Sequence, residues 1–259
     1  MKAIQLVITL LALCVTSKEL SAQEYKMQVE NTKAGKLIIS DFAGDFPVEG
    51  YNGNEIIITS TSSKFSNTPE RAKGLKAVYS KGTDNTGIGL RVEKKGSTVT
   101  VECLLPITQR ESYKIKVPNN LALDIKSGCE LWSSISIRNI NNEIEINNCN
   151  SINIKAVSGP LVLSTISGEI NVVLTSLNKD KPTSIASVSG NIDITLPAKT
   201  PADVEMSTIS GSVYTDFDLT NPKDKMQRIG GNNIKNSLNG GGAGLKISNV
   251  SGDIYLRKG

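Results

Sequence analysis

A short phrase that recurs along the second half of the chain limits the possible fold more than any other feature. It reads aliphatic, Ser, Gly, any residue, aliphatic. The close copies are Val157–Leu161, Ile166–Ile170, Val188–Ile192, Ile209–Val213 and Val250–Ile254, and weaker copies are Phe42–Phe46 and Ile140–Ile144. A phrase that returns this often predicts a chain built from stacked copies of one small unit.

Two columns of turn residues give the unit its length. The first column contains Gly128, Asn148, Gly168, Gly190, Gly211, Gly231 and Gly252, separated by 20 to 22 residues. Glycine and asparagine tolerate the positive φ that a tight turn often requires. The second column falls about midway and is rich in Pro, Gly and Asn, at 178–182, 197–201, 221–224 and 239–244. Each repeat is therefore predicted to run strand, loop, strand, tight turn.

The residues between the turns alternate in polarity, as half-buried strands do. Ile192, Ile194 and Leu196 face one way, while Asp193 and Thr195 face the other. Small or polar residues just before the tight turns are expected to stack at the corner, namely Asn139, Ala156, Thr165, Ser187, Thr208 and Asn249. One repeat cannot bury its apolar face alone, but a stack of repeats can.

The pattern thus predicts an all-β fold, a β-helix-like β-solenoid of roughly 20-residue two-strand repeats. A β-sandwich of hairpins is the alternative, although a sandwich gives no reason for one phrase to recur. We expect the repeat solenoid to occupy 121–259, and 23–120 to form a less regular, β-rich N-terminal cap.

The expected cap contains strands, a hairpin and a short helix. Residues 36–40, 55–61 and 114–117 are predicted strands, and 90–102 is a predicted hairpin that turns at Lys95 and Gly96. The short helix is expected over 68–79, with Thr68 as its N-cap and Pro69 as its first residue.

The first 22 residues have the layout of a secretory signal peptide. Lys2 precedes the apolar run Ala3–Val15, and small residues at Ser21 and Ala22 offer a cleavage point. Cys14 follows the large Leu13, so it does not fit a lipoprotein signal. No second long apolar run follows, so we expect an exported protein without a transmembrane helix, located in the periplasm, on the outer surface or outside the cell.

Charge and residue types exclude several functions. The chain has no histidine, which removes a common general base and metal ligand. A net charge of +4 from 29 basic and 25 acidic residues does not indicate nucleic-acid binding. Cys103, Cys129 and Cys149 form no CxxC pair, so neither a metal site nor a cofactor is expected. Cys129 and Cys149 lie one repeat apart and should be close, with a bridge possible, while Cys103 stays free.

The second half of the sequence and its flanks resemble a known family. The segment Ile39–Ile58, the Val-Ser-Gly-x-Ile series, Asp84–Leu90 and the ending Ile247–Leu256 are similar to the bacterial adhesin-like toastrack family, a domain family of unknown function. The resemblance covers nearly all of the chain after residue 22. It implies a β-solenoid-like fold and a surface location with a binding role. It implies no ligand and no functional residue.

Several motifs are candidates for binding, and each has a structural interpretation that we favour. The Asn-rich run 139–153 suggests a sugar-binding surface, but stacked corner asparagines explain it better. The loop 239–244 lacks the Gly-Lys-Ser/Thr ending of a phosphate loop. Asp84 and Asn85 provide too few carboxylates for calcium. Trp132 and Tyr51 could stack on sugars, although a lone tryptophan more often packs.

Catalysis is the least favoured interpretation. A polysaccharide-active enzyme would need paired acids on one face. The candidates Glu145, Glu169, Asp193 and Glu205 are spread over different repeats, and stacking brings at most Glu169 and Asp193 near each other. We therefore expect a non-catalytic scaffold whose partner is an envelope or surface protein or a glycan. A sensor or regulatory partner of envelope-stress machinery is the alternative.

Overall fold

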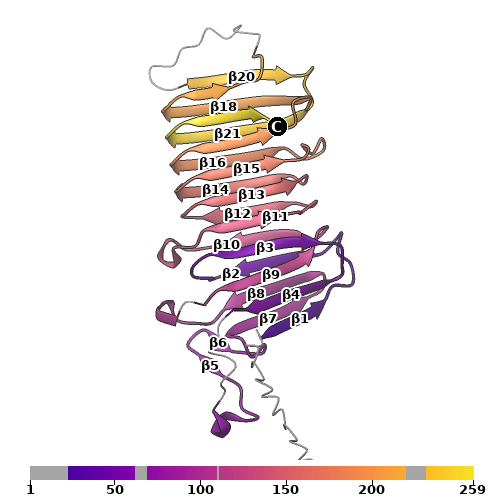
Figure 1. Ribbon diagram of the computed structural model, residues 1–259, viewed down its shortest axis with the longest axis vertical. Coiled ribbons are helices and arrows are strands. Elements are labelled where there is room, and N and C mark those ends of the chain that lie inside the picture. The colour runs from indigo at the N-terminus through magenta and orange to yellow at the C-terminus, as the bar shows by residue number, and fades with distance from the viewer. Residues whose placement is uncertain (1–22, 62–68, 110, 220–231) are drawn as a thin grey trace, which may run out of the picture.

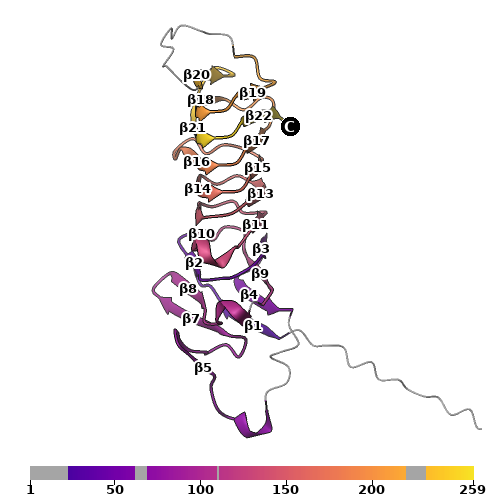
Figure 2. The same ribbon diagram turned by 90° about the vertical axis from the view of Figure 1, so that its left-hand side faces the viewer.

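The computed structural model describes residues 23–61, 69–109, 111–219 and 232–259. In this part the protein is a tall stack of strands arranged in two facing ten-stranded sheets, called sheet A and sheet B, with a small two-stranded sheet at the N-terminal end. Figures 1 and 2 show that the strands lie across the long axis of the stack. The all-β prediction is therefore confirmed.

The strand bounds follow the order of the strands in space. Sheet A contains β1 (Glu24–Gln28), β4 (Glu55–Ser60), β9 (Tyr113–Pro118), β3 (Phe46–Tyr51), β11 (Ile135–Arg138), β13 (Ile152–Val157), β15 (Ile170–Leu174), β17 (Ile192–Leu196), β22 (Ile254–Lys258) and β19 (Val213–Thr215). Sheet B contains β20 (Asn232–Leu238), β18 (Ala202–Ser210), β21 (Ala243–Ser251), β16 (Thr183–Ser189), β14 (Leu161–Ser167), β12 (Ile144–Asn148), β10 (Ala122–Lys126), β2 (Lys36–Ser40), β8 (Thr98–Cys103) and β7 (Leu90–Lys95). The small sheet pairs β5 (Val78–Tyr79) with β6 (Gly82–Thr83).

The apolar core lies between the two sheets, because alternate side chains of each strand point inward. In β17 the predicted inward residues Ile192, Ile194 and Leu196 are each 0% exposed. Val204, Met206, Leu245 and Ile247 line the facing side from sheet B, and all are buried. Small aliphatic side chains fill this space, as the low aromatic content of the chain requires.

Strands of the two sheets alternate along the chain and form coils. We call a sheet-B strand and the sheet-A strand that follows it a coil. The corner edge is the side where sheet B turns into sheet A within a coil, and the loop edge is the side where the chain returns to sheet B. At the corner edge, Gly168, Gly190, Gly211 and Gly252 all have positive φ. Four of the close copies of the phrase lie there, while the copy at Val157–Leu161 lies at the loop edge.

The coils do not stack in sequence order. The last coil, β21 and β22, lies between the coil of β16 and β17 and the coil of β18 and β19. Near the N-terminal end, β2 and β3 lie between β10 and β11 on one side and β8 and β9 on the other. Figure 1 shows both insertions as breaks in the colour sequence. The strands are parallel at each of these contacts, so an inserted coil pairs with both neighbours.

The first turn column needs correction. Gly128 has φ −73° and precedes the 3-10 turn Cys129–Leu131, and Asn148 is buried inside β12. Neither is a tight corner. The reason is that the coils differ in length. Leu123 pairs with Ile144, and Ile144 pairs in turn with Leu161, so the second of these two coils is shorter than the first. Gly231 and the loop 221–224 lie outside the described residues.

The small and polar residues expected at the corner divide between the two edges. Asn148, Thr165, Ser187, Asn249 and Thr208 form one buried row at the corner edge, at matched positions on successive strands of sheet B. Asn139 and Ala156 do not belong to it, which corrects the prediction. They follow β11 and lie near the end of β13, at the loop edge, where both have positive φ.

The N-terminal part confirms the hairpin but not the helix. Strands β7 and β8 pair antiparallel and turn at Gly96, which has φ 60°. The helix expected over 68–79 is only a 3-10 turn at Glu70–Ala72, and Thr68 lies outside the described residues. This segment buries no residue, so no packing stabilises a longer helix.

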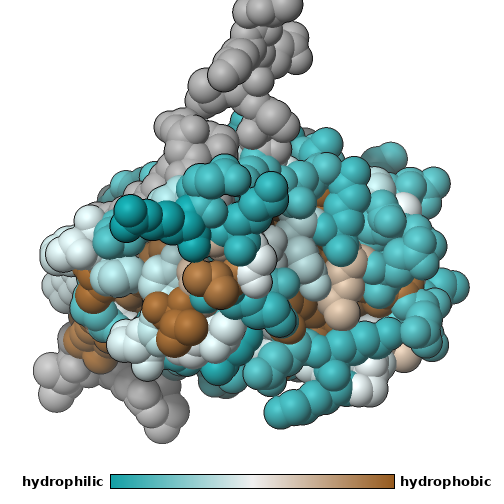
Figure 3. Space-filling model, turned by 90° about the horizontal axis from the view of Figure 1, so that it is seen from below, coloured by the Kyte–Doolittle hydropathy of each residue, from teal (hydrophilic) through white to brown (hydrophobic). Residues whose placement is uncertain are grey.

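The two sheets continue across residue 120. Strands β2 and β8, from the expected cap, pair directly with each other and extend sheet B beyond β10. A division into an N-terminal cap and a solenoid at that point remains a prediction. Antiparallel strands cover both ends of the stack: β7, β4 and β1 at one end and β20 at the other. Figure 3 looks onto the N-terminal end and shows a largely hydrophilic surface with separate apolar patches.

The cysteines confirm the expected contact. Cys129 and Cys149 form a disulfide with Cα atoms 4.9 Å apart, which joins the β10 coil to the β12 coil at the corner edge. Cys103 is free and buried, and burial raises the pKa of its thiol.

Candidate functional site

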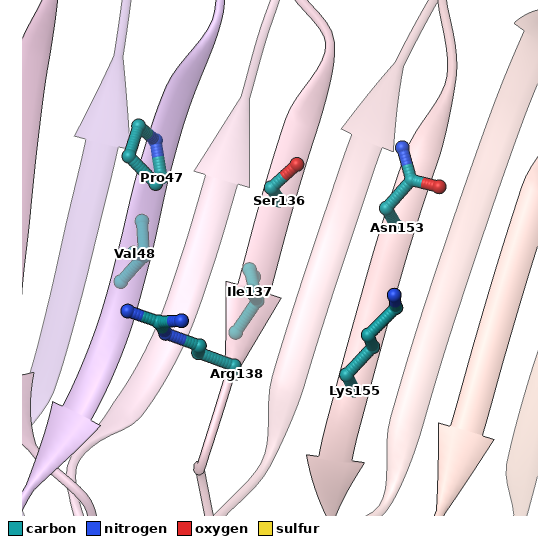
Figure 4. Close-up of a pocket in the computed structure, with 7 residues that line it drawn as sticks. All are labelled: Pro47, Val48, Ser136, Ile137, Arg138, Asn153 and Lys155. Atoms are coloured by element: carbon teal, nitrogen blue, oxygen red, sulfur yellow. The ribbon is translucent and has the colours of Figure 1, made fainter.

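The outer face of sheet A has a shallow, open depression of about 400 Å³. It lies over β3, β11 and β13, and its lining residues are Pro47, Val48, Ser136, Ile137, Arg138, Asn153 and Lys155. In Figure 4 the polar side chains of three neighbouring strands share one face. Val48 and Ile137 are buried beneath them and belong to the core. The depression is therefore a polar surface on a rigid apolar floor.

Strand register extends the depression into two rows of side chains across sheet A. The basic row consists of Lys116, Glu49, Arg138 and Lys155, which lie opposite one another on β9, β3, β11 and β13. The polar row consists of Pro47, Ser136, Asn153, Asn171, Asp193, Tyr255 and Tyr214. Neighbouring members of a row stand about 4.8 Å apart, the spacing of strands.

The basic row has an excess of positive charge. Arg138 donates to Glu49 over 2.8 Å, and this is the one ion pair among the described residues of the row. Lys116 and Lys155 are exposed and form no ion pair within the described part of the chain. On sheet B, by contrast, Lys36 lies 2.9 Å from Asp124 and Lys235 lies 3.4 Å from Glu205.

Polar donors complete the depression. Asn171 donates to the side-chain oxygen of Asn153 over 3.1 Å, so the Asn153 amide group is held in place with its NH₂ free to donate elsewhere. Ser136 adds a hydroxyl on the neighbouring strand. Two cations, an amide and a hydroxyl on one face form a set suited to anionic oxygens and sugar hydroxyls.

The Asn-rich run and the calcium candidate both have structural roles. The Asn148 amide donates to the backbone oxygens of Ser133 and Asn150, which confirms the stacked-asparagine interpretation at that position. Asp84 accepts from the backbone N–H groups of Thr86, Gly87 and Gly89 at 2.8 to 2.9 Å. Both carboxylate oxygens are thus occupied by a turn. Among the described residues no group of His, Cys, Asp or Glu is arranged for a metal.

The glycine-rich loop 239–244 forms a turn at the loop edge. Gly240, Gly241 and Gly242 have positive φ, and the Asn239 amide donates to the backbone oxygens of Ala198 and Thr200. Its side chain therefore joins two loops of neighbouring coils. The preference for a turn over a phosphate site is confirmed in this geometry.

The two aromatic candidates differ. Tyr51 closes the turn between β3 and β4, because its hydroxyl donates to the Glu55 oxygen and accepts from the Glu55 N–H. Trp132 does not pack into the core, contrary to the favoured interpretation. It is 67% exposed, with φ 51°, directly after the 3-10 turn that carries Cys129.

The acids considered for catalysis lie on two opposite faces. Glu145 and Glu205 are on sheet B, while Asp193 and the neighbouring Glu169 are on sheet A. Glu205 pairs with Lys235, and Asp193 accepts from the Arg257 Nε over 2.9 Å. Asp193 lies opposite Asn171 in register, so Glu169 is out of line with it. The described structure brings no two of these acids into one row.

Sequence inspection missed the residues of the depression. The spacing between Arg138 and Lys155 is shorter than the repeat period that the turn residues indicate, and it matches no known motif. Cross-strand register alone brings them together. Aligning the strands by their inward aliphatic residues, rather than by the Ser-Gly turns, would have placed both in one row.

The fold and this surface describe an all-β protein of stacked coils with an open polar face. The chain belongs to the Toastrack DUF4097 family, whose model matches residues 7–257. No match was found among curated proteins. No helix in the described residues has the length and apolar character needed to span a membrane.

Three solved structures show a weak likeness. A candidate cell adhesion protein from Clostridium sporogenes is 14% identical, with 92% of this chain and 100% of that chain covered and a TM-score of 0.44. A candidate adhesin from Bacteroides fragilis is 13% identical, with 91% and 95% covered and a TM-score of 0.34. A candidate lipid binding protein from Parabacteroides distasonis is 10% identical, with 92% and 98% covered and a TM-score of 0.28. Membership of the family rests on the family model.

Proposed function

We propose that the protein is an exported, non-catalytic β-solenoid scaffold of the cell envelope or surface that binds acidic glycans through the depression on sheet A. The observation that carries this proposal is the pair of unneutralised cations, Lys116 and Lys155, on either side of the Glu49–Arg138 pair. Cations without a protein partner on a flat face favour an anionic ligand. A regularly spaced row favours a ligand that is itself a regular chain.

An acidic polysaccharide fits this surface better than a small anion does. An exposed ion pair contributes only about 0.2–1 kcal/mol, so one site would bind weakly. A chain with a carboxylate on each sugar can meet several cations at once, and its hydroxyls can reach Ser136 and Asn153. The open shape of the depression also leaves room for a chain to pass through.

The experiment measures the affinity of hexagalacturonate for the mature chain and for two matched variants. Lys155→Glu reverses a charge in the basic row, and Lys246→Glu reverses an exposed charge on a strand of sheet B. Lys155→Glu should weaken binding roughly fivefold to thirtyfold, since about 1–2 kcal/mol is lost. Lys246→Glu should change it less than twofold. An equal effect of both variants, or no binding to the wild-type chain, would refute the proposal.

The proposed export rests on the signal-like residues 1–22. Strand β1 begins at Glu24, and the first backbone bond to the sheet is donated by Ser60 to the Gln23 oxygen over 2.9 Å. Cleavage after Ala22 would therefore leave the pairing of β1 whole. The intact mass of the exported protein should correspond to a chain that starts at Gln23. A mass that includes Met1, or a lipid on Cys14, would contradict this part of the proposal.

A further inference from the structure

The aromatic residues of the repeat region gather away from the core. Residues 121–259 contain four aromatic side chains: Trp132, Tyr214, Phe217 and Tyr255. Tyr214 and Tyr255 stand side by side on the outer face of sheet A, at the C-terminal end of the polar row. Their rings stack with centroids 5.3 Å apart and an angle of 13° between the planes. Tyr214 is 51% exposed.

The stacked rings are held firmly in place. The Tyr255 hydroxyl donates to Asp253 over 3.1 Å, and this hydrogen bond raises the pKa of Tyr255. The Arg257 guanidinium lies 5.1 Å from the centre of the Tyr255 ring, and its Nε donates to Asp193 over 2.9 Å. A ring that is already ordered loses little entropy when a ligand stacks on it.

The groups around the rings complement a sugar. A pyranose ring has an apolar C–H face and a rim of hydroxyls. Aromatic rings offer area for the apolar face, and the carboxylates of Asp193 and Asp253 can accept from hydroxyls while Arg257 donates. Few polar groups around an apolar platform are typical of small-molecule sites. The position is also in line with Asn153 and Asn171, in the row that leads to the depression.

From this arrangement we infer that Tyr214 and Tyr255 form a stacking subsite for an uncharged pyranose ring of a glycan chain. This inference rests on the proposed function and deepens it, because it adds a second subsite farther along the polar row, beyond β15 and β17 from the depression. The depression would take the acidic sugars and the tyrosine pair the neutral ones. In sheet A, β19 is the last strand among the described residues, so the pair stands at the end of the row.

A purely structural role is the competing explanation, since two tyrosines could simply cover the end of the stack. The two roles make different demands on the side chain. Covering the end requires an apolar group of similar size, which leucine also provides. Stacking on a sugar requires a flat ring, which phenylalanine provides and leucine does not.

The test measures binding of the uncharged hexasaccharides cellohexaose, chitohexaose and maltohexaose to the mature chain by calorimetry, with thermal unfolding as a check of folding. At least one of the three should bind. Tyr214→Leu should weaken that binding at least fivefold, while Tyr214→Phe should stay within twofold of the wild type. Trp132→Ala, which removes an exposed aromatic elsewhere, should have no effect.

The outcomes separate this inference from the proposed function. Lys155→Glu should weaken the binding of hexagalacturonate and leave the uncharged hexasaccharide unaffected. If none of the three uncharged sugars binds, or if Tyr214→Leu binds as tightly as the wild type, the stacking subsite is wrong, even where the acidic glycan binds as proposed. If hexagalacturonate does not bind but an uncharged sugar does, in a way that depends on Tyr214, the basic depression loses its role and the stacking subsite stands.

Discussion

The corner edge and the loop edge of the stack follow different physical rules. At the corner edge the glycines lie directly over one another: a Cβ at Gly190 would clash with the backbone oxygen of Gly168, and one at Gly252 would clash with that of Gly190. At the loop edge a Cβ at Gly240 would meet nothing within 4 Å. The comparison teaches that the contact between coils limits the sequence at the corner, whereas the loops need only connect the strands.

The largest difference between the edges should come from the glycines. Gly190 and Gly240 both have positive φ, at 116° and 90°, so valine at either position is strained. Only Gly190 adds a clash with the neighbouring coil. We expect Gly190→Val to lower the free energy of unfolding by about 3 kcal/mol or more, and Gly240→Val by roughly 1 kcal/mol. Urea denaturation measures both, and equal losses would show that the corner contact has no special weight.

The disulfide should have the next largest effect. The bridge between Cys129 and Cys149 closes a segment of 20 residues at the corner edge. Replacing both cysteines by serine should cost about 2–3 kcal/mol, largely because the unfolded chain gains freedom. Adding a reductant to the wild type should lower the denaturation midpoint by the same amount, and should not affect the double variant. A midpoint that does not respond to reductant would contradict the bridge.

The polar row at the corner edge should give the smallest of the three effects. The Asn249 amide donates to the Gly190 oxygen over 2.8 Å within a buried position. Asn249→Ala leaves that oxygen without this partner and should cost about 1–2 kcal/mol. The matched change Asn178→Ala lies in an exposed loop, where water can replace the bonds to Asp180 and Lys181, and should cost less than about 0.5 kcal/mol. If Asn178→Ala costs as much as Asn249→Ala, the two edges do not differ in this respect.

The sequence alone predicts the all-β class, the alternation within strands and the corners at Gly168, Gly190, Gly211 and Gly252. It does not predict the order of the coils. Copies of one phrase are interchangeable, so nothing local in Val250–Ile254 says that β21 and β22 lie between earlier coils. Nor does it separate the aliphatic residues of the phrase: Ile166 is 53% exposed whereas Ile170 is fully buried.

The candidate surface was hidden for a related reason. Lys155 and Arg138 look like ordinary charges on polar strand faces until the register places them opposite each other. Tyr214 and Tyr255 are far apart in the sequence and become neighbours only because the last coil is inserted. A surface built from rows across strands depends on the stacking order, which is the property that the repeat leaves open.

The most direct test of the proposed function locates the acidic glycan on the molecule. Backbone amide chemical shifts of the labelled mature chain would be followed by NMR during titration with hexagalacturonate. The account predicts that shift changes centre on β3, β11 and β13 around Arg138 and Lys155, while the outer face of sheet B stays unchanged. Changes that centre on sheet B or on the corner edge would contradict the proposed binding surface.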